Sequence, residues 1–193
     1  MRFDRRGFLA LSLGLGACAA TPRETAVLPE FTGFLSIDPV RYSIEQGAAM
    51  LSDPRVLVAR PWEVARLIQS LEFLAVELPA GPGWNVRLPM GSIAVPAARA
   101  EWRAAFGIAA DARAQEVIDS LSTLRNAYAA RSIAGAADAL RQPLFTPGGQ
   151  GSLARLAELP SLPRTTRAMV DARQELAGSM NERRAMGGFA VTL

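Results

Sequence analysis

The chain has 193 residues, of which 50% are hydrophobic and 20% are charged, and its formal net charge is +3. This composition is typical of one folded domain and carries too little charge for a disordered chain. All 21 basic residues are arginine, so the chain has neither lysine nor histidine, and it has one cysteine. These absences exclude histidine-dependent catalysis, histidine ligands for zinc or haem, lysine Schiff bases and internal disulfides. We therefore expect a protein that is not an enzyme and that holds no cofactor and no metal ion.

The arginines are spread along the sequence instead of gathering in one run. Residues 1–17 contain three of them and one aspartate, so the remainder of the chain is close to neutral. Proteins that bind nucleic acids need a basic stripe or patch to neutralise the phosphates. We therefore expect no nucleic-acid partner.

The first 18 residues have the pattern of an export signal. Arg5 and Arg6 precede a short apolar run over residues 8–17, and the run ends at Cys18. It is too short to cross a bilayer as a helix, which needs about 20 apolar residues. A basic start, a short apolar middle and small residues at the end are typical of a signal peptide that is removed.

Two motifs in this leader resemble known signals. Residues 4–9 (DRRGFL) resemble the twin-arginine export signal, and Leu15-Gly16-Ala17-Cys18 resembles the lipobox of bacterial lipoproteins. The second resemblance implies cleavage before Cys18 and attachment of a diacylglyceryl group, usually with an N-acyl chain, to that residue. Because alanine and not aspartate follows the cysteine, the resemblance implies the outer membrane, with the inner membrane as the alternative. The general secretory route, and an ordinary secretory signal in which Cys18 is incidental, stay open.

The expected organisation is a cleaved leader at residues 1–17, a lipidated N-terminus and tether at 18–37, and a domain at 38–193. Prolines and a glycine interrupt any periodicity in the tether, but it also holds apolar residues such as Val27 and Leu28. We expect it to begin free and to end packed on the domain. No run of 18 apolar residues follows the leader, so no second membrane element is expected.

Apolar spacing of three and four residues predicts an all-α, single bundle-like domain of five to seven helices. Asp38 before Pro39 has the residue types of an N-cap and a first helical position, and this helix should run to about Leu51. The core helix is expected at 61–78, with Gln69 off its apolar face. That face consists of Val64, Leu67, Ile68, Leu71, Leu74, Ala75 and Leu78.

Later helices are predicted from their start and stop residues. One should begin at Pro96 and end at Gly107, and the next should have Asp111 as its N-cap and carry a heptad-like seam that ends at Tyr128. Others are expected at 132–141, at 152–159 and from Pro163 to about 185. Alternating residues predict a short hairpin or ordered loop near 84–95, beside which the tail at 189–193 would lie.

Three kinds of feature are candidates for a functional role. The glycine-rich stretch 148–151 precedes a helix, but it lacks the lysine of a phosphate-binding loop, so a plain turn is favoured. Two carboxylate pairs, Glu116/Asp119 and Asp171/Glu175, have the spacing for acid–base hydrolysis, but neighbouring arginines favour an ion-paired surface. Of the three tryptophans, the one in the Gly-Pro-Gly-Trp turn, Trp84, is the candidate for an exposed interaction surface.

These observations favour a lipid-anchored cell-envelope protein that binds or scaffolds a protein partner and has no catalytic activity. Two alternatives are an accessory subunit of an exported oxidoreductase and a carrier of a small apolar ligand. A carrier would need an apolar pocket of about 300 Å³ or more among its helices. An enzyme that acts through carboxylates alone is the last alternative.

Overall fold

A computed structural model describes residues 24–29 and 38–188, with side chains to residue 181. The leader, with Arg5, Arg6 and Cys18, and the tail at 189–193 lie outside these residues. The described part forms a single all-α domain with one short 3-10 turn, η2 (Pro54–Val56). Its helices are α1 (Pro39–Ser52), α2 (Pro61–Ala80), α3 (Trp84–Arg87), α4 (Gly91–Phe106), α5 (Ala114–Ala129), α6 (Ile133–Ala139), α7 (Gly149–Glu158) and α8 (Pro163–Gly188).

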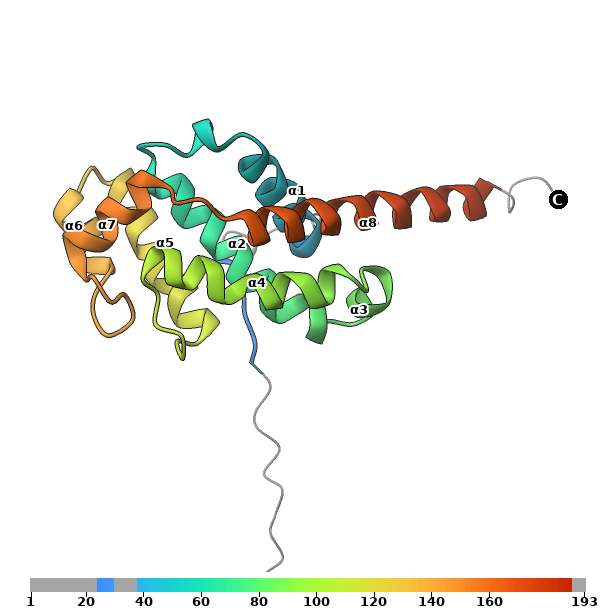
Figure 1. Cartoon of the computed structure of the whole chain (residues 1–193), viewed down its shortest axis with the longest axis horizontal. Coiled ribbons are helices and arrows are strands. Elements are labelled where there is room, and N and C mark those ends of the chain that lie inside the picture. Colours follow the sequence, from blue (N-terminus) through green and yellow to red (C-terminus); the bar gives the residue numbers. More distant parts are fainter. Residues whose placement is uncertain (1–23, 30–37, 189–193) are drawn as a thin grey trace, which may run out of the picture.

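Helix α2 is the centre of the domain, as the sequence predicts. It packs against α1, α4, α5 and α7, and Figure 1 shows these helices arranged around it. All seven apolar positions predicted for its core face are buried. Gln69, which is predicted to lie off this face, is also buried, with 1% of its surface exposed, so the prediction of a single buried face is corrected. The helix has neighbours on several sides, so its buried surface is wider than one amphipathic stripe.

Several helix ends follow their sequence signals. The Asp38 carboxylate accepts hydrogen bonds from the amides of Val40 and Arg41, which confirms it as the N-cap of α1. Ser132 caps α6 in the same way through the amide of Gly135. Gly107 ends α4 with a φ of +69°, a conformation that residues other than glycine adopt at a cost.

The hairpin or loop predicted near 84–95 is wrong, because α3 and the start of α4 occupy this stretch. Helix α4 begins at Gly91, and Pro96 lies inside it instead of starting it. The cause is a contact far along the chain. The Glu175 carboxylate of α8 accepts hydrogen bonds from the amides of Met90 (3.0 Å) and Gly91 (2.8 Å) and so satisfies two unpaired groups of the helix start.

The predicted N-cap of α5 is also wrong. Its N-cap position is Arg113, not Asp111, and no side chain from that position caps the helix. Instead, the amide of Ala114 donates to the carboxylate of Glu24 at 2.6 Å. A residue 90 positions earlier therefore supplies the capping oxygen, which sequence signals near 111 do not reveal.

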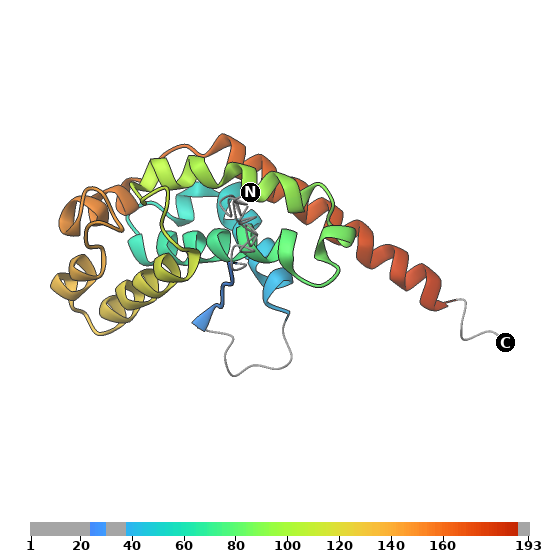
Figure 2. The ribbon, with the colours of Figure 1, turned by 90° about the horizontal axis from the view of Figure 1, so that it is seen from below.

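Helix α8 packs on α1 and α4 with its first half and then extends beyond the other helices (Figures 1 and 2). Leu176 is the last buried residue along it for which burial is described. Within the described residues, no helix is both long enough and apolar enough to span a bilayer.

Candidate functional site

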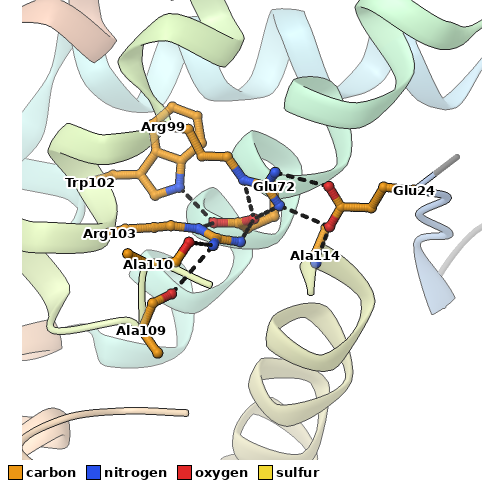
Figure 3. A network of polar contacts seen from close by, with 8 residues as sticks. All are labelled: Glu24, Glu72, Arg99, Trp102, Arg103, Ala109, Ala110 and Ala114. Carbon is orange, nitrogen blue, oxygen red and sulfur yellow. Dashed lines mark hydrogen bonds and ion pairs between the residues drawn. The ribbon is translucent and has the colours of Figure 1, made fainter. Parts of the chain in front are cut away.

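A buried carboxylate is the centre of the polar contacts in this domain. Glu72 of α2 has no exposed surface. Its Oε1 accepts hydrogen bonds from Trp102 Nε1 (2.9 Å) and Arg103 Nε (2.8 Å), and its Oε2 accepts from Arg103 Nη2 (2.7 Å) and Arg99 Nη2 (2.8 Å). Figure 3 shows the three α4 side chains converging on this carboxylate. Two guanidinium groups thus compensate a charge that would otherwise be costly to bury.

The same arginines extend the network to the loop before α5 and to the N-terminal part of the chain. Arg103 Nη1 donates to the carbonyl oxygens of Ala110 (2.9 Å) and Ala109 (3.3 Å). Arg99 donates through Nη1 and Nη2 to Glu24, at 3.0 and 3.2 Å. The hydrogen bonds from Arg99 and from the Ala114 amide outweigh partial burial and hold the pKa of Glu24 below its usual value. We call the side chains of Glu24, Glu72, Arg99, Trp102 and Arg103 the buried network.

Residues 24–29, which we call the docked segment, contact the start of α5 and are drawn in blue on the lower side of the domain in Figure 1. Ala26 and Leu28 are buried. Between them, the Val27 amide donates to Gln115 Oε1 at 2.8 Å, and Gln115 Nε2 donates back to the Val27 carbonyl oxygen at 3.3 Å. Part of the stretch predicted as a tether is therefore held against the domain by packing, hydrogen bonds and an ion pair.

The docked segment ends at the rim of a surface groove with a volume of about 710 Å³. The rings of Trp62 and Tyr128 lie 5.2 Å apart in this groove at an interplanar angle of 49°. Trp62 keeps 37% of its surface exposed. We call this hollow the aromatic groove. It is lined by Pro29, Trp62, Ser122, Arg125, Asn126, Tyr128 and Ala129.

Hydrogen bonds from α2 fix the polar wall of the aromatic groove. Gln69 Nε2 donates to Ser122 Oγ at 2.6 Å and to the Ile118 carbonyl oxygen at 3.0 Å. Its Oε1 accepts from Arg125 Nη1 at 3.0 Å. Burial also raises the pKa of the Tyr128 phenol. Among the described residues, the groove therefore holds the Trp62 and Tyr128 rings and the Arg125 guanidinium in fixed positions.

This arrangement is suited to binding. The described lining of the groove contains no carboxylate and no thiol that would serve as a general base or a nucleophile. Across the residues described by the structure, no three acidic or cysteine side chains cluster closely enough to hold a metal ion. Tryptophan, tyrosine and arginine are the residue types that contribute most to protein interfaces.

The three tryptophans have different surroundings. Trp84, the predicted interaction residue, is half-buried in α3, and the guanidinium of Arg87 lies 5.3 Å from its ring centre. Trp102 belongs to the buried network, and Trp62 is the one in the aromatic groove. The position of Trp62 at the second residue of α2, off the predicted apolar face, is the sequence signal that could have identified it.

Three of the four paired carboxylates and the glycine-rich stretch have structural contacts. Asp171 forms an ion pair with Arg167 at 2.9 Å, while Glu175 caps α4, so this carboxylate pair has two separate structural partners. Asp119 accepts a hydrogen bond from Gln115. The glycine-rich stretch starts α7, where Gly148 has a φ of +67° that suits a turn.

Sequence reasoning did not identify the buried network. Glu72 lies in the run Leu71-Glu72-Phe73-Leu74, where each neighbour is apolar and buried. A carboxylate inside such a run is a signal, because a buried acid needs a partner. The partners Arg99 and Arg103 lie about 30 positions away, and nothing local specifies that pairing.

Comparison with protein-family models, with curated proteins and with solved structures finds no match to this chain. Its function is therefore inferred from its own residues.

Proposed function

We propose that this protein is a lipid-anchored cell-envelope protein that binds a protein partner and has no catalytic activity. In this proposal Cys18 carries the lipid, and the leader with Arg5 and Arg6 directs export. The domain faces the periplasm from the outer membrane, with the inner membrane as the alternative. The aromatic groove is the partner-binding surface.

The observation that carries the anchor proposal is the short distance in sequence between the lipobox and the docked segment. Only residues 19–23 separate Cys18 from Glu24, which is fixed by Arg99 and by the amide of Ala114. A chain of six residues spans about 20 Å at most. Lipid attached at Cys18 would therefore hold the domain at the membrane surface, not at the end of a long linker.

The aromatic groove supports the binding part of the proposal. Its volume lies within the range of about 300–1,000 Å³ that is usual for binding pockets, and the exposed ring of Trp62 lies beside Tyr128 and Arg125. The one charged residue in the described lining is an arginine. A partner segment with an apolar or aromatic side chain would match the exposed Trp62 ring.

The anchor is tested by replacing Cys18 with serine. Membranes from cells that express each protein are separated from soluble material, and the N-terminal peptide is weighed by mass spectrometry. The proposal expects an acylated peptide in wild type and loss of the membrane-bound fraction in Cys18→Ser. Membrane retention of Cys18→Ser with an unmodified wild-type peptide would contradict it.

The groove is tested by purifying the lipidated protein in gentle detergent with whatever binds to it. The amount of a stoichiometric partner that co-purifies should fall at least tenfold in Trp62→Ala. Loss of an interface tryptophan costs about 2 kcal/mol of binding free energy or more. Trp84→Ala is the matched control, because Trp84 lies outside the groove, and it should retain the partner. A wild-type protein that purifies alone, or equal loss in both variants, would count against the groove.

The carrier alternative has weaker support. The aromatic groove is open to solvent, and Ser122, Arg125 and Asn126 form much of its wall. An apolar ligand is better held by an enclosed cavity that buries most of its surface.

A further inference from the structure

A second surface of the domain has exposed apolar side chains and lies within reach of the lipid. It is formed by α3, the turn after it and the first residues of α4 (residues 84–93), and we call it the α3–α4 corner. Val86 is 78% exposed, Met90 is 61% exposed and Ile93 is 68% exposed. Three large apolar side chains this exposed within eight consecutive residues are unusual on a surface that faces only water.

The backbone of this corner is held in place from beneath. Leu88 is fully buried, and the Glu175 carboxylate of α8 accepts the amide hydrogen bonds of Met90 and Gly91. Ser92 Oγ donates to the Pro89 carbonyl oxygen at 2.9 Å. The apolar side chains are thus presented by a fixed turn.

The charges around the corner are suited to a lipid headgroup layer. The Arg87 guanidinium lies over the Trp84 ring, and α4 and α8 border a shallow groove that contains Arg164 and Arg167. Of the acids nearby, Glu175 is engaged by backbone amides, Asp171 forms an ion pair with Arg167, and the Glu77 carboxylate lies beside Gly81 and Trp84. Tryptophan, exposed aliphatic side chains and arginine together are typical of segments that lie in the membrane interface.

The docked segment places this corner close to the proposed anchor. Glu24 is bound to Arg99, which follows Ile93 by six residues on α4, or about 9 Å along the helix axis. The chain from Cys18 to Glu24 reaches about 20 Å. Lipid attached at Cys18 and the α3–α4 corner can therefore reach the same membrane surface.

We infer that the α3–α4 corner inserts Val86, Met90 and Ile93 into the headgroup layer of the membrane that holds the lipid anchor. This inference rests on the proposed lipidation of Cys18. The insertion gives the domain a fixed orientation, with the α3–α4 corner against the lipid; α6 lies at the far end of the domain from α3 (Figure 1).

The test uses the full-length acylated protein in vesicles of phosphatidylethanolamine and phosphatidylglycerol. Because acylation would consume the thiol of Cys18, Ile93→Cys would carry the single reactive thiol in the chain. It is labelled with a fluorophore that shifts to the blue in an apolar environment. Ile133→Cys is the matched control, since Ile133 is another exposed isoleucine, 52% accessible, on α6.

The expected result is a blue shift at position 93 that a lipid-borne nitroxide quenches, with a label at 133 that stays in water. Val86→Cys should behave like Ile93→Cys and guards against disturbance by a single label. A water-exposed label at 93 in a protein whose N-terminus has the acylated mass would overturn the inference and leave the anchor standing. A blue shift without quenching by the nitroxide would show that protein, not lipid, covers the corner, and this would also overturn the inference. Quenching at both positions would show that the domain has no fixed orientation on the membrane, which would overturn it as well. Absence of the acylated mass would overturn the proposed function and this inference together.

Discussion

At the scale of single residues, the fold depends on one carboxylate that has no contact with solvent. Glu72 binds Arg99, Trp102 and Arg103, and through them it connects α2 to α4 and to the loop before α5. Removing one partner of a buried ion pair leaves the other charges without compensation, which costs more than the pair itself contributes.

We therefore predict that Glu72→Gln lowers the free energy of unfolding by about 3–5 kcal/mol. The glutamine keeps the size of the side chain, but it leaves the buried Arg103 and the partly exposed Arg99 with Glu24 as the one remaining anion in the network. The measurement is urea unfolding at neutral pH, followed by circular dichroism. The control is Asp138→Asn, since the Arg141–Asp138 pair has side chains that are 73% and 68% exposed. That variant should change stability by less than about 0.5 kcal/mol, and similar losses in both would contradict the prediction.

Glu24 gives a prediction about pH. Its folded-state pKa is lowered by the hydrogen bond from Arg99, so this carboxylate stabilises the folded protein above the usual glutamate value of 4.5. The contribution is lost as the pH falls through the lowered folded pKa, because protons then bind more readily to the unfolded chain. Glu24→Gln should cost about 1 kcal/mol at pH 7. The difference between wild type and variant in urea unfolding should shrink as the pH is lowered below 4.5. A difference that stays constant over this range would contradict the assignment.

At the scale of elements, the end of α4 depends on a glycine with two requirements. Gly107 has a φ of +69°, and a Cβ atom placed on it would lie 2.6 Å from Pro147 Cδ. We predict that Gly107→Ala lowers stability by about 2 kcal/mol or more, because the left-handed conformation alone costs roughly 1 kcal/mol.

The control is the same substitution in α8. Gly178 is helical, and a Cβ atom there would have no neighbour within 4 Å. Gly178→Ala should raise the midpoint of thermal unfolding, with a gain of about 0.4–1 kcal/mol, since alanine has less freedom to lose on folding. Equal effects of the two substitutions would show that the left-handed turn and the Pro147 contact do not determine stability.

The sequence predicts a helix correctly where the residues that start or end it and its apolar face lie close together in the chain. Helix α1 with its Asp38 cap, the central helix α2 and the end of α4 at Gly107 are examples. The wrong predictions for the starts of α4 and α5 have one cause. Helices α4 and α5 begin where carboxylates from distant parts of the chain, Glu175 and Glu24, accept their first amide hydrogens. Local patterns at 96 and 111 do not contain that information.

At the scale of the whole molecule, the all-α class followed from apolar spacing, while the candidate sites did not. The aromatic groove combines Trp62 at the start of α2, Tyr128 near the end of α5 and Pro29 of the docked segment. Tyr128 continues the apolar spacing of α5, so the sequence alone assigns it to the core. Its partly exposed position follows from the packing of α2 against α5, which only the three-dimensional arrangement shows.

The docked segment also determines where a mechanical load on the N-terminal side of the chain would enter the domain. The load would reach Glu24 before α1, and it would be shared between the Arg99 guanidinium on α4 and the first amide of α5. Burial of Ala26 and Leu28 adds resistance behind that point. Force would thus act where α4 and α5 bind the docked segment and would not peel the first helix from its end, so α1 would be shielded from it.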